Sequence, residues 1–145
     1  MVDNNSGNII SLGNKMKKID AANSILLSRI FDKTGWPSNR IFSDSAVNAA
    51  FYITLHNTHN DLSSLLIILE KAFTLEQIDI SHYAVLIDRI LIRKGLSQRY
   101  GTHCRRNSDG LTTYISLDDS VTVAKNRASI GLKALEKSSC ELMFY

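Results

Sequence analysis

The segment from Gln98 to His103 holds the densest set of hydrogen-bonding side chains in the chain. The planar guanidinium of Arg99 can bind a phosphate or a carboxylate in a bidentate manner. Tyr100 can stack on a ligand or donate a proton, and His103 titrates near neutral pH. Gln98 and Thr102 can orient neighbouring groups. The segment is therefore a candidate binding or catalytic surface, and the alternative is a plain connector between two elements.

Asp88 is the most unusual acidic residue. The residues one helical turn away on either side are all apolar: Ala84, Val85, Leu91 and Ile92. A carboxylate in such surroundings needs a cation or hydrogen bonds from another segment, and Arg99 and Arg127 are the candidates. Arg89 points about 100° away from Asp88 on the same helix. Asp88 either forms an ion pair that fixes the helix to a loop or orients a catalytic histidine.

Two further positions could belong to a site. His56 lies near the end of an expected helix and is followed at i+3 by His59, a spacing at which two imidazoles can share one metal ion. No third ligand is evident nearby, so we expect a histidine favoured by the helix dipole, no metal and no cofactor. Trp36, between Gly35 and Pro37, is either a packing lid over the core or one wall of a pocket.

The apolar periodicity predicts the elements that must position these residues. It indicates a mainly α protein: a compact bundle of about five helices with a small β-hairpin inserted before the last helix. Residues 1–14 are expected to be a flexible lead-in, and residues 15–145 a single helical domain. The expected helices span 15–33, 43–57, 61–73, 79–94 and 118–130, and the hairpin loop is 107–110.

Composition limits the class of protein. A chain of 145 residues with 44% apolar residues and one proline is typical of a single globular domain. Cys104 and Cys140 lie far apart in the sequence and fit free thiols in a reducing compartment. A signal-peptide pattern and an uncharged apolar stretch long enough to cross a membrane are both missing. We therefore expect a cytoplasmic protein without membrane contact.

The charge distribution is uneven. The formal net charge is +3, with 17 Lys and Arg against 14 Asp and Glu. Residues 89–106 contain six basic residues and no acidic one, so the rest of the chain carries 11 minus 14, or −3. This segment is a candidate surface for an anionic partner, although a solvated helix end also produces such a run.

Several short motifs, taken together, resemble a bacterial family known as domain of unknown function 6624. They are Gly35-Trp36-Pro37, His56, Leu86-Ile87-Asp88-Arg89-Ile90, Gln98-Arg99-Tyr100-Gly101-Thr102, Arg127 and Gly131-Leu132. The resemblance extends from about Asp20 to about Lys137. In that family a Gln usually precedes the histidine and another follows Tyr-Gly-Thr, whereas this chain has Leu55 and His103. The resemblance implies one polar cluster formed by His56, Asp88, Arg89, Gln98, Tyr100, Thr102 and Arg127.

The first functional hypothesis is a metal-independent enzyme acting on a phosphate-bearing or otherwise anionic small molecule, such as a nucleotide. His56 or His103 would be the general acid or base, and Arg89 or Arg99 would stabilise developing charge. Catalytic roles are predicted for His56, Asp88, Tyr100 and His103, and substrate contacts for Trp36, Arg89, Gln98, Arg99, Thr102 and Arg127.

Two alternatives come from other classes. One is a non-catalytic protein-binding or immunity-type module, in which the same cluster is an internal hydrogen-bond network. The other is non-specific nucleic-acid binding through residues 89–106. The sequence leaves these functions open.

Overall fold

A computed structural model of the chain describes residues 4–56 and 62–135. The chain divides into two compact units, Met1–Asp61 and Leu62–Tyr145, and each is described by itself. A compact unit need not fold as an independent domain, so the expected single domain over 15–145 stays a prediction.

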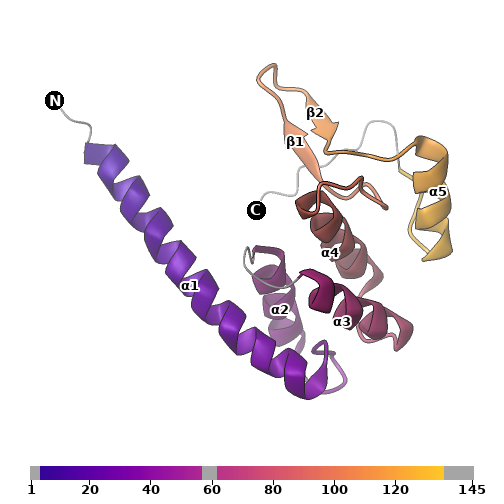
Figure 1. Ribbon diagram of the computed structural model, residues 1–145, viewed down its shortest axis with the longest axis horizontal. Coiled ribbons are helices and arrows are strands. Elements are labelled where there is room, and N and C mark those ends of the chain that lie inside the picture. The colour runs from indigo at the N-terminus through magenta and orange to yellow at the C-terminus, as the bar shows by residue number, and fades with distance from the viewer. Residues whose placement is uncertain (1–3, 57–61, 136–145) are drawn as a thin grey trace. The chain divides into compact units, whose positions relative to one another are not determined.

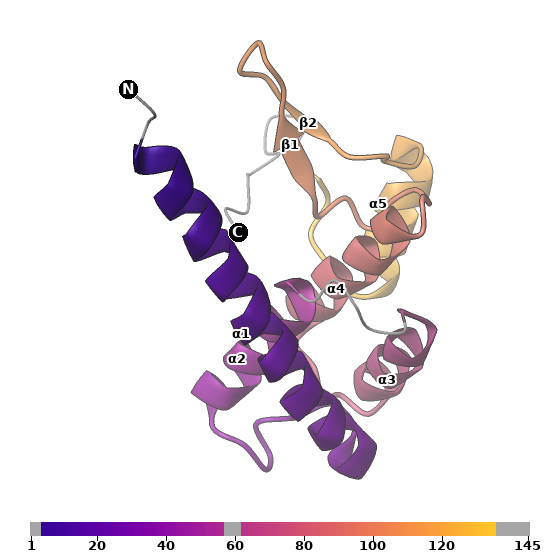
Figure 2. The same ribbon diagram turned by 60° about the vertical axis from the view of Figure 1, so that its left-hand side comes forward.

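The first unit contains two helices, α1 (Asn4–Thr34) and α2 (Asp44–His56) (Figure 1). The helix α1 begins at Asn4 rather than at Lys15, so it includes most of the expected flexible lead-in. Once a helix is nucleated, each further residue adds a hydrogen bond, and polar residues of low propensity can be incorporated. The N-terminal half of α1 extends beyond α2 in both views (Figures 1 and 2).

The core of the first unit lies between the two helices, which contact each other. On α1 the buried residues are Ser24, Leu27 and Phe31, which share one helical face. The buried residues of α2 are Val47, Ala50, Phe51, Thr54 and Leu55.

The second unit contains the remaining elements in chain order: α3 (Leu62–Thr74), α4 (Ile80–Arg93), β1 (Cys104–Arg106), β2 (Thr112–Tyr114) and α5 (Ser120–Ser129). The two strands pair antiparallel, with Cys104 opposite Tyr114 and Arg106 opposite Thr112. The predicted fold class, five helices with a hairpin before the last one, is confirmed.

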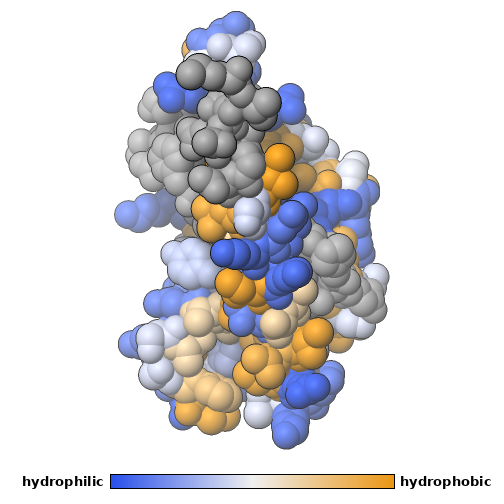
Figure 3. All heavy atoms as spheres, turned by 90° about the vertical axis from the view of Figure 1, so that its left-hand side faces the viewer, coloured by the Kyte–Doolittle hydropathy of each residue, from blue (hydrophilic) through white to orange (hydrophobic). Residues whose placement is uncertain are grey.

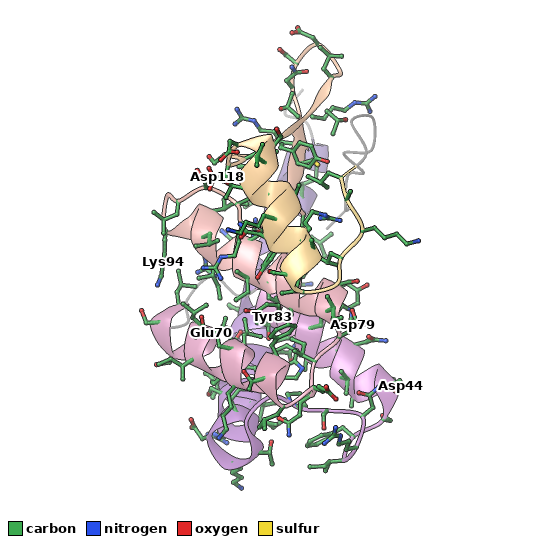
Figure 4. The ribbon with its side chains drawn as sticks, turned by 90° about the vertical axis from the view of Figure 1, so that its right-hand side faces the viewer. Asp44, Glu70, Asp79, Tyr83, Lys94 and Asp118 are labelled. Carbon is green, nitrogen blue, oxygen red and sulfur yellow. The ribbon has the colours of Figure 1, made fainter. Side chains whose placement is uncertain are left out.

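Helix α4 contributes more residues to the core of this unit than any other element. Its buried residues are Tyr83, Ala84, Val85, Leu86, Ile87, Asp88 and Ile90, so nearly its whole circumference is covered. Asp79 caps its N-terminus through Oδ1, which accepts hydrogen bonds from the N–H groups of Ser81 and His82. Figure 4 labels Asp79 and Lys94 at the two ends of the helix. Helix α3 packs on α4, where Phe73 stacks on Tyr83 with 4.4 Å between ring centroids.

Two expectations about the cellular compartment have different outcomes. Within the described residues, no helix combines the length and the apolar character needed to cross a membrane. Cys104 is disulfide-bonded, so the expectation of a free thiol is wrong at this position, and cysteine usage no longer supports a reducing compartment. The other cysteine, Cys140, lies outside the described residues. Bacterial origin and a cytoplasmic location stay predictions.

Candidate functional site

The carboxylate of Asp88 is fully buried and holds the turn that follows α4. Its Oδ1 accepts hydrogen bonds from the main-chain N–H groups of Arg99 at 2.7 Å and Tyr100 at 3.0 Å. Its Oδ2 accepts from the main-chain N–H of Thr102 at 3.0 Å and from the Thr102 hydroxyl at 2.9 Å. Four donors therefore replace the water that burial removes from the charge. We expected the cationic side chains of Arg99 or Arg127 as partners, and Arg99 provides its backbone N–H instead.

The side-chain amide of Gln98 forms hydrogen bonds across the same turn, to the backbone of His103. Its Oε1 accepts from the main-chain N–H of His103 at 2.7 Å, and its Nε2 donates to the His103 carbonyl at 2.8 Å. The Nε2 also donates to the carbonyl of Ile115, and the Gln98 N–H donates to the carbonyl of Ser116 at 2.7 Å. Gln98 is fully buried, so its side chain is a structural link between the turn and the segment after β2.

The imidazole of His103 is committed to an internal contact. Its Nε2 lies 2.9 Å from the carbonyl of Val85 on α4, which requires a proton on that nitrogen. Burial lowers the pKa of His103, and the charge of nearby Arg89 lowers it further, whereas the hydrogen bond to Val85 and the charge of Asp88 raise it. His103 is 6% exposed, so the neutral ring serves as a packed donor.

Helix α5 holds the carbonyl side of the turn. Arg127 donates from Nη1 to the carbonyl of Tyr100 at 2.7 Å and from Nε to the carbonyl of Lys133 at 2.6 Å. Asn126 donates from Nδ2 to the carbonyl of Arg99 at 3.2 Å. Asp88 thus holds the N–H groups of the turn, and α5 holds its carbonyl groups.

The remaining predicted residues of this unit are placed differently. Tyr100 is 3% exposed and lies against Tyr83, and burial together with Tyr100 raises the pKa of Tyr83 to about 12. Arg89 is half-buried, and its Nε has no hydrogen-bond partner among the described residues. The side chain of Arg99 is exposed. Asp88, Gln98, Tyr100, Thr102, His103 and Arg127 therefore meet at one turn, and the role of this cluster stays a prediction.

Two predicted residues belong to the first unit. Trp36 is buried and stacks on Phe31 with 5.6 Å between ring centroids, which fits the interpretation as a packing lid. His56 is exposed at the end of α2. The predicted association of His56 and Trp36 with the cluster around Asp88 stays a prediction, as does a catalytic role for any of these residues.

Metal binding has little support in the part of the chain that the structure describes. Residues 4–56 and 62–135 contain no group of three His, Cys, Asp or Glu side chains that could hold a metal ion. His59, the possible second ligand beside His56, lies outside the described residues. The expected absence of a metal and of a cofactor stays a prediction.

A cavity beside the turn was not predicted. It has a volume of about 330 Å³ and is lined by Tyr114, Leu117, Ser120, Val123, Ala124, Ala134 and Leu135. A Cβ at Gly101 would come within 2.7 Å of Leu135 and 3.0 Å of Leu117, so the turn lies directly behind this cavity. The Tyr114 hydroxyl is buried without a hydrogen-bond partner among the described residues. The lining of the cavity comes from β2, α5 and the segments that follow them, and no local sequence pattern indicated a cavity there.

The geometry defines a rigid turn rather than an open set of reactive groups. The groups of the turn that are suited to proton transfer, His103 and Tyr100, are buried, and the exposed charge on the turn is Arg99.

No curated protein and no solved structure matches the chain. The family of unknown function DUF6624 matches residues 2–143, which is nearly the whole chain. The chain therefore belongs to the DUF6624 family.

Proposed function

We propose that this protein is a non-catalytic protein-binding module whose buried polar network is a scaffold for an exposed basic surface. The observation that carries the proposal is the set of four hydrogen bonds that Asp88 accepts from the turn. A carboxylate with all its donors in the protein is already satisfied and needs no ligand.

The other buried polar groups of the turn support the same proposal. The His103 ring nitrogen Nε2 is held by the Val85 carbonyl, and both polar atoms of the Gln98 amide are used within the fold. A general base must reach the proton that it removes, and a buried donor in a fixed hydrogen bond does not. The network is best explained as a device that fixes backbone geometry.

The surface that the network positions is cationic. Arg99 on the turn and Arg105 and Arg106 on β1 are exposed. The backbone of Arg99 is fixed on both sides, by Asp88 at its N–H and by Asn126 at its carbonyl. A fixed backbone reduces the freedom that the residue loses on binding, and the guanidinium pairs well with carboxylates. We therefore propose an acidic surface of a partner protein as the ligand.

The test is charge reversal on this surface. Wild type and an Arg99→Glu, Arg105→Glu double variant are expressed with an affinity tag, and the partner recovered by wild type is purified for calorimetry. The double variant should lose binding while its melting temperature stays close to that of wild type. The control, Lys33→Glu with Lys71→Glu, makes the same change of charge at exposed positions outside the turn and the hairpin and should retain binding.

A second candidate is the predicted enzyme acting on an anionic small molecule. The cavity beside Gly101 favours it, together with the Tyr114 hydroxyl, which has no hydrogen-bond partner within residues 4–56 and 62–135. Thermal shifts with inorganic phosphate, nucleotides and sugar phosphates distinguish the two candidates. A ligand at 100 times its Kd stabilises the folded state by about 2.7 kcal/mol. A shift of that size, lost on Arg127→Gln, would favour the enzyme and contradict the binding module. Binding of nucleic acid would instead weaken steeply with salt.

A further inference from the structure

Helix α1 carries a regular apolar stripe, and the N-terminal part of this stripe lies outside its packing on α2. The stripe positions follow a spacing of three and four residues in alternation, which is the heptad pattern of a coiled coil. In heptad notation the a positions are Ile9, Met16, Asn23 and Ile30, and the d positions are Leu12, Ile19 and Leu26. The residues that α1 buries, Ser24, Leu27 and Phe31, occupy other heptad positions.

Most of the stripe is exposed. The exposed fractions are 65% for Ile9, 60% for Leu12, 57% for Met16, 59% for Ile19 and 57% for Leu26. Figure 3 shows hydrophobic residues exposed among hydrophilic ones on the face of the molecule that it views. A series of large apolar side chains along one helix face is costly in water and marks an interaction surface.

Two features of the stripe favour a two-stranded coiled coil. One is isoleucine at a with leucine at d, as at Ile9 and Leu12, which is the combination found in parallel dimers and from which Ile19 at d departs. Asn23 is the one polar residue of the stripe and lies at an a position. A single asparagine at a specifies register and a two-stranded state, because its amide is satisfied by the matching amide of the partner helix.

The charged residues beside the stripe indicate which helix it pairs with and whether the two helices run parallel. Lys15 occupies a g position and Asp20 the next e position. In a parallel, in-register pair of identical helices, each g side chain lies beside the following e side chain of the other helix. Lys15 of one copy would therefore meet Asp20 of the other, twice per pair. The stripe is complementary to itself.

We infer that α1 pairs with α1 of a second copy of this chain in a parallel, in-register, two-stranded coiled coil. The seam is formed chiefly by the exposed positions from Ile9 to Ile19, and Asn23 and Leu26 lie at its C-terminal end, where they and Ile30 border a cavity of about 220 Å³ against α2. The inference goes beyond the proposed function and does not depend on it, since it rests on the first unit alone.

The first experiment measures the oligomeric state of the full chain by sedimentation velocity over a wide concentration range. Wild type is expected to form dimers. Ile19→Asp places a charge in the seam and should give monomers that keep the helical circular-dichroism signal. Ala21→Asp adds the same charge at an exposed f position, away from the seam, and should leave the dimer intact.

The second experiment tests direction and register. Lys15→Glu places two acids opposite each other and should weaken the dimer, and Lys15→Glu combined with Asp20→Lys restores opposite charges and should restore it. Met16→Cys should cross-link between copies on oxidation, because identical a positions face each other. Asn14→Cys, at an f position, should not cross-link, and wild type serves as the control for the native cysteines.

Monomeric wild type at every concentration would overturn the inference, whether the stripe is covered by another protein or by this chain itself. A dimer that survives Ile19→Asp would also overturn it, because the contact would then lie elsewhere. A dimer lost in Ile19→Asp but without cross-linking at Met16→Cys would refute the parallel register.

Discussion

Asp88 is a buried charge whose cost is offset by hydrogen bonds from one short turn. An ionised carboxylate without partners would be strongly destabilising in a core, whereas four donors at 2.7 to 3.0 Å make it a fixed anchor. Asp88 is a charged acceptor, whereas His103 is a neutral donor whose Nε2 donates to the carbonyl of Val85. Both residues connect α4 to the turn, so both should affect stability more than any chemical step.

Replacing Asp88 by Asn tests this anchor. The amide keeps the shape of the carboxylate, but its NH2 group would face N–H donors that need an acceptor. We expect the free energy of unfolding to fall by about 3 kcal/mol, measured by urea denaturation. Asp109→Asn, at an exposed carboxylate in the hairpin loop, should change it by less than about 0.5 kcal/mol. Equal stability of the two variants would contradict the anchoring role.

The stability of the fold should depend on the protonation of His103. Burial lowers its pKa below the ordinary value of 6.5, so the unfolded chain binds the proton more readily than the folded one. The stabilising contribution is complete above pH 6.5 and is lost as the pH falls through 6.5 toward the folded pKa. The loss is at most about 1.4 kcal/mol per pH unit.

Urea unfolding at about pH 7.5 and about pH 5.5 measures this loss. His103→Gln should reduce the difference between the two pH values. Burial also lowers the pKa of His82, so His82 should add to the same loss of stability at low pH. His82→Gln is therefore measured beside His103→Gln to separate the two contributions. A pH difference that is unchanged in His103→Gln would refute the prediction.

At the scale of elements, the turn between α4 and β1 depends on Gly101. Its φ of +66° lies in the left-handed region, and the space beside it is filled by Leu135 and Leu117. The turn therefore needs both an unusual backbone angle and the absence of a side chain. The turn is hydrogen-bonded to α4 on one side and to α5 on the other, so a change at Gly101 should affect how both helices are held.

Comparing the stabilities of Gly101→Ala and Gly95→Ala separates the cost of the backbone angle from the cost of the added side chain. Gly95 has a φ of +72°, but a Cβ at this position would meet nothing within 4 Å, so its substitution costs the backbone strain alone, about 1 kcal/mol. Gly101→Ala adds the clash with Leu135 and should lower the free energy of unfolding by about 1–3 kcal/mol more. Equal losses in urea denaturation would show that Leu135 and Leu117 move aside freely.

At the scale of the whole molecule, the two proposed surfaces lie on different units. The exposed arginines Arg99, Arg105 and Arg106 belong to the turn and hairpin of the second unit, whereas the exposed apolar stripe, with Lys15 and Asp20 beside it, lies on α1 of the first. We propose an acidic partner for the first surface and a second copy of the chain for the other. Pairing two copies would double the number of basic surfaces in one particle and raise its avidity for a multivalent partner.

Self-association through α1 makes thermal stability depend on concentration. Because only the folded helix pairs, mass action should raise the Tm of wild type as the protein concentration increases. Ile19→Asp should have a Tm that is independent of concentration, and differential scanning calorimetry of both proteins checks this. A flat dependence in wild type would contradict coupling between folding and association.

The sequence predicted most of the fold because local signals were strong. Helices α4 and α5 lie close to the predicted ranges 79–94 and 118–130, because Asp79 and Asp119 cap their N-termini, and the hairpin loop lies at 107–110 as expected. The start of α1 was missed, because Asn, Ser and Gly near the N-terminus suggested a flexible segment. The heptad pattern becomes visible only when the helix is known to begin at Asn4.

The sequence by itself also determined that Asp88 required partners, since apolar neighbours surround it on its helix. The identity of those partners was a matter of tertiary structure, because backbone N–H groups are present at every residue and carry no sequence signal. Only the fold brought the turn within reach of Asp88 and directed Arg127 to the carbonyl of Tyr100. Hydrogen bonds between distant backbone and side-chain atoms depend on how the helices pack, and packing is not a local property of the chain.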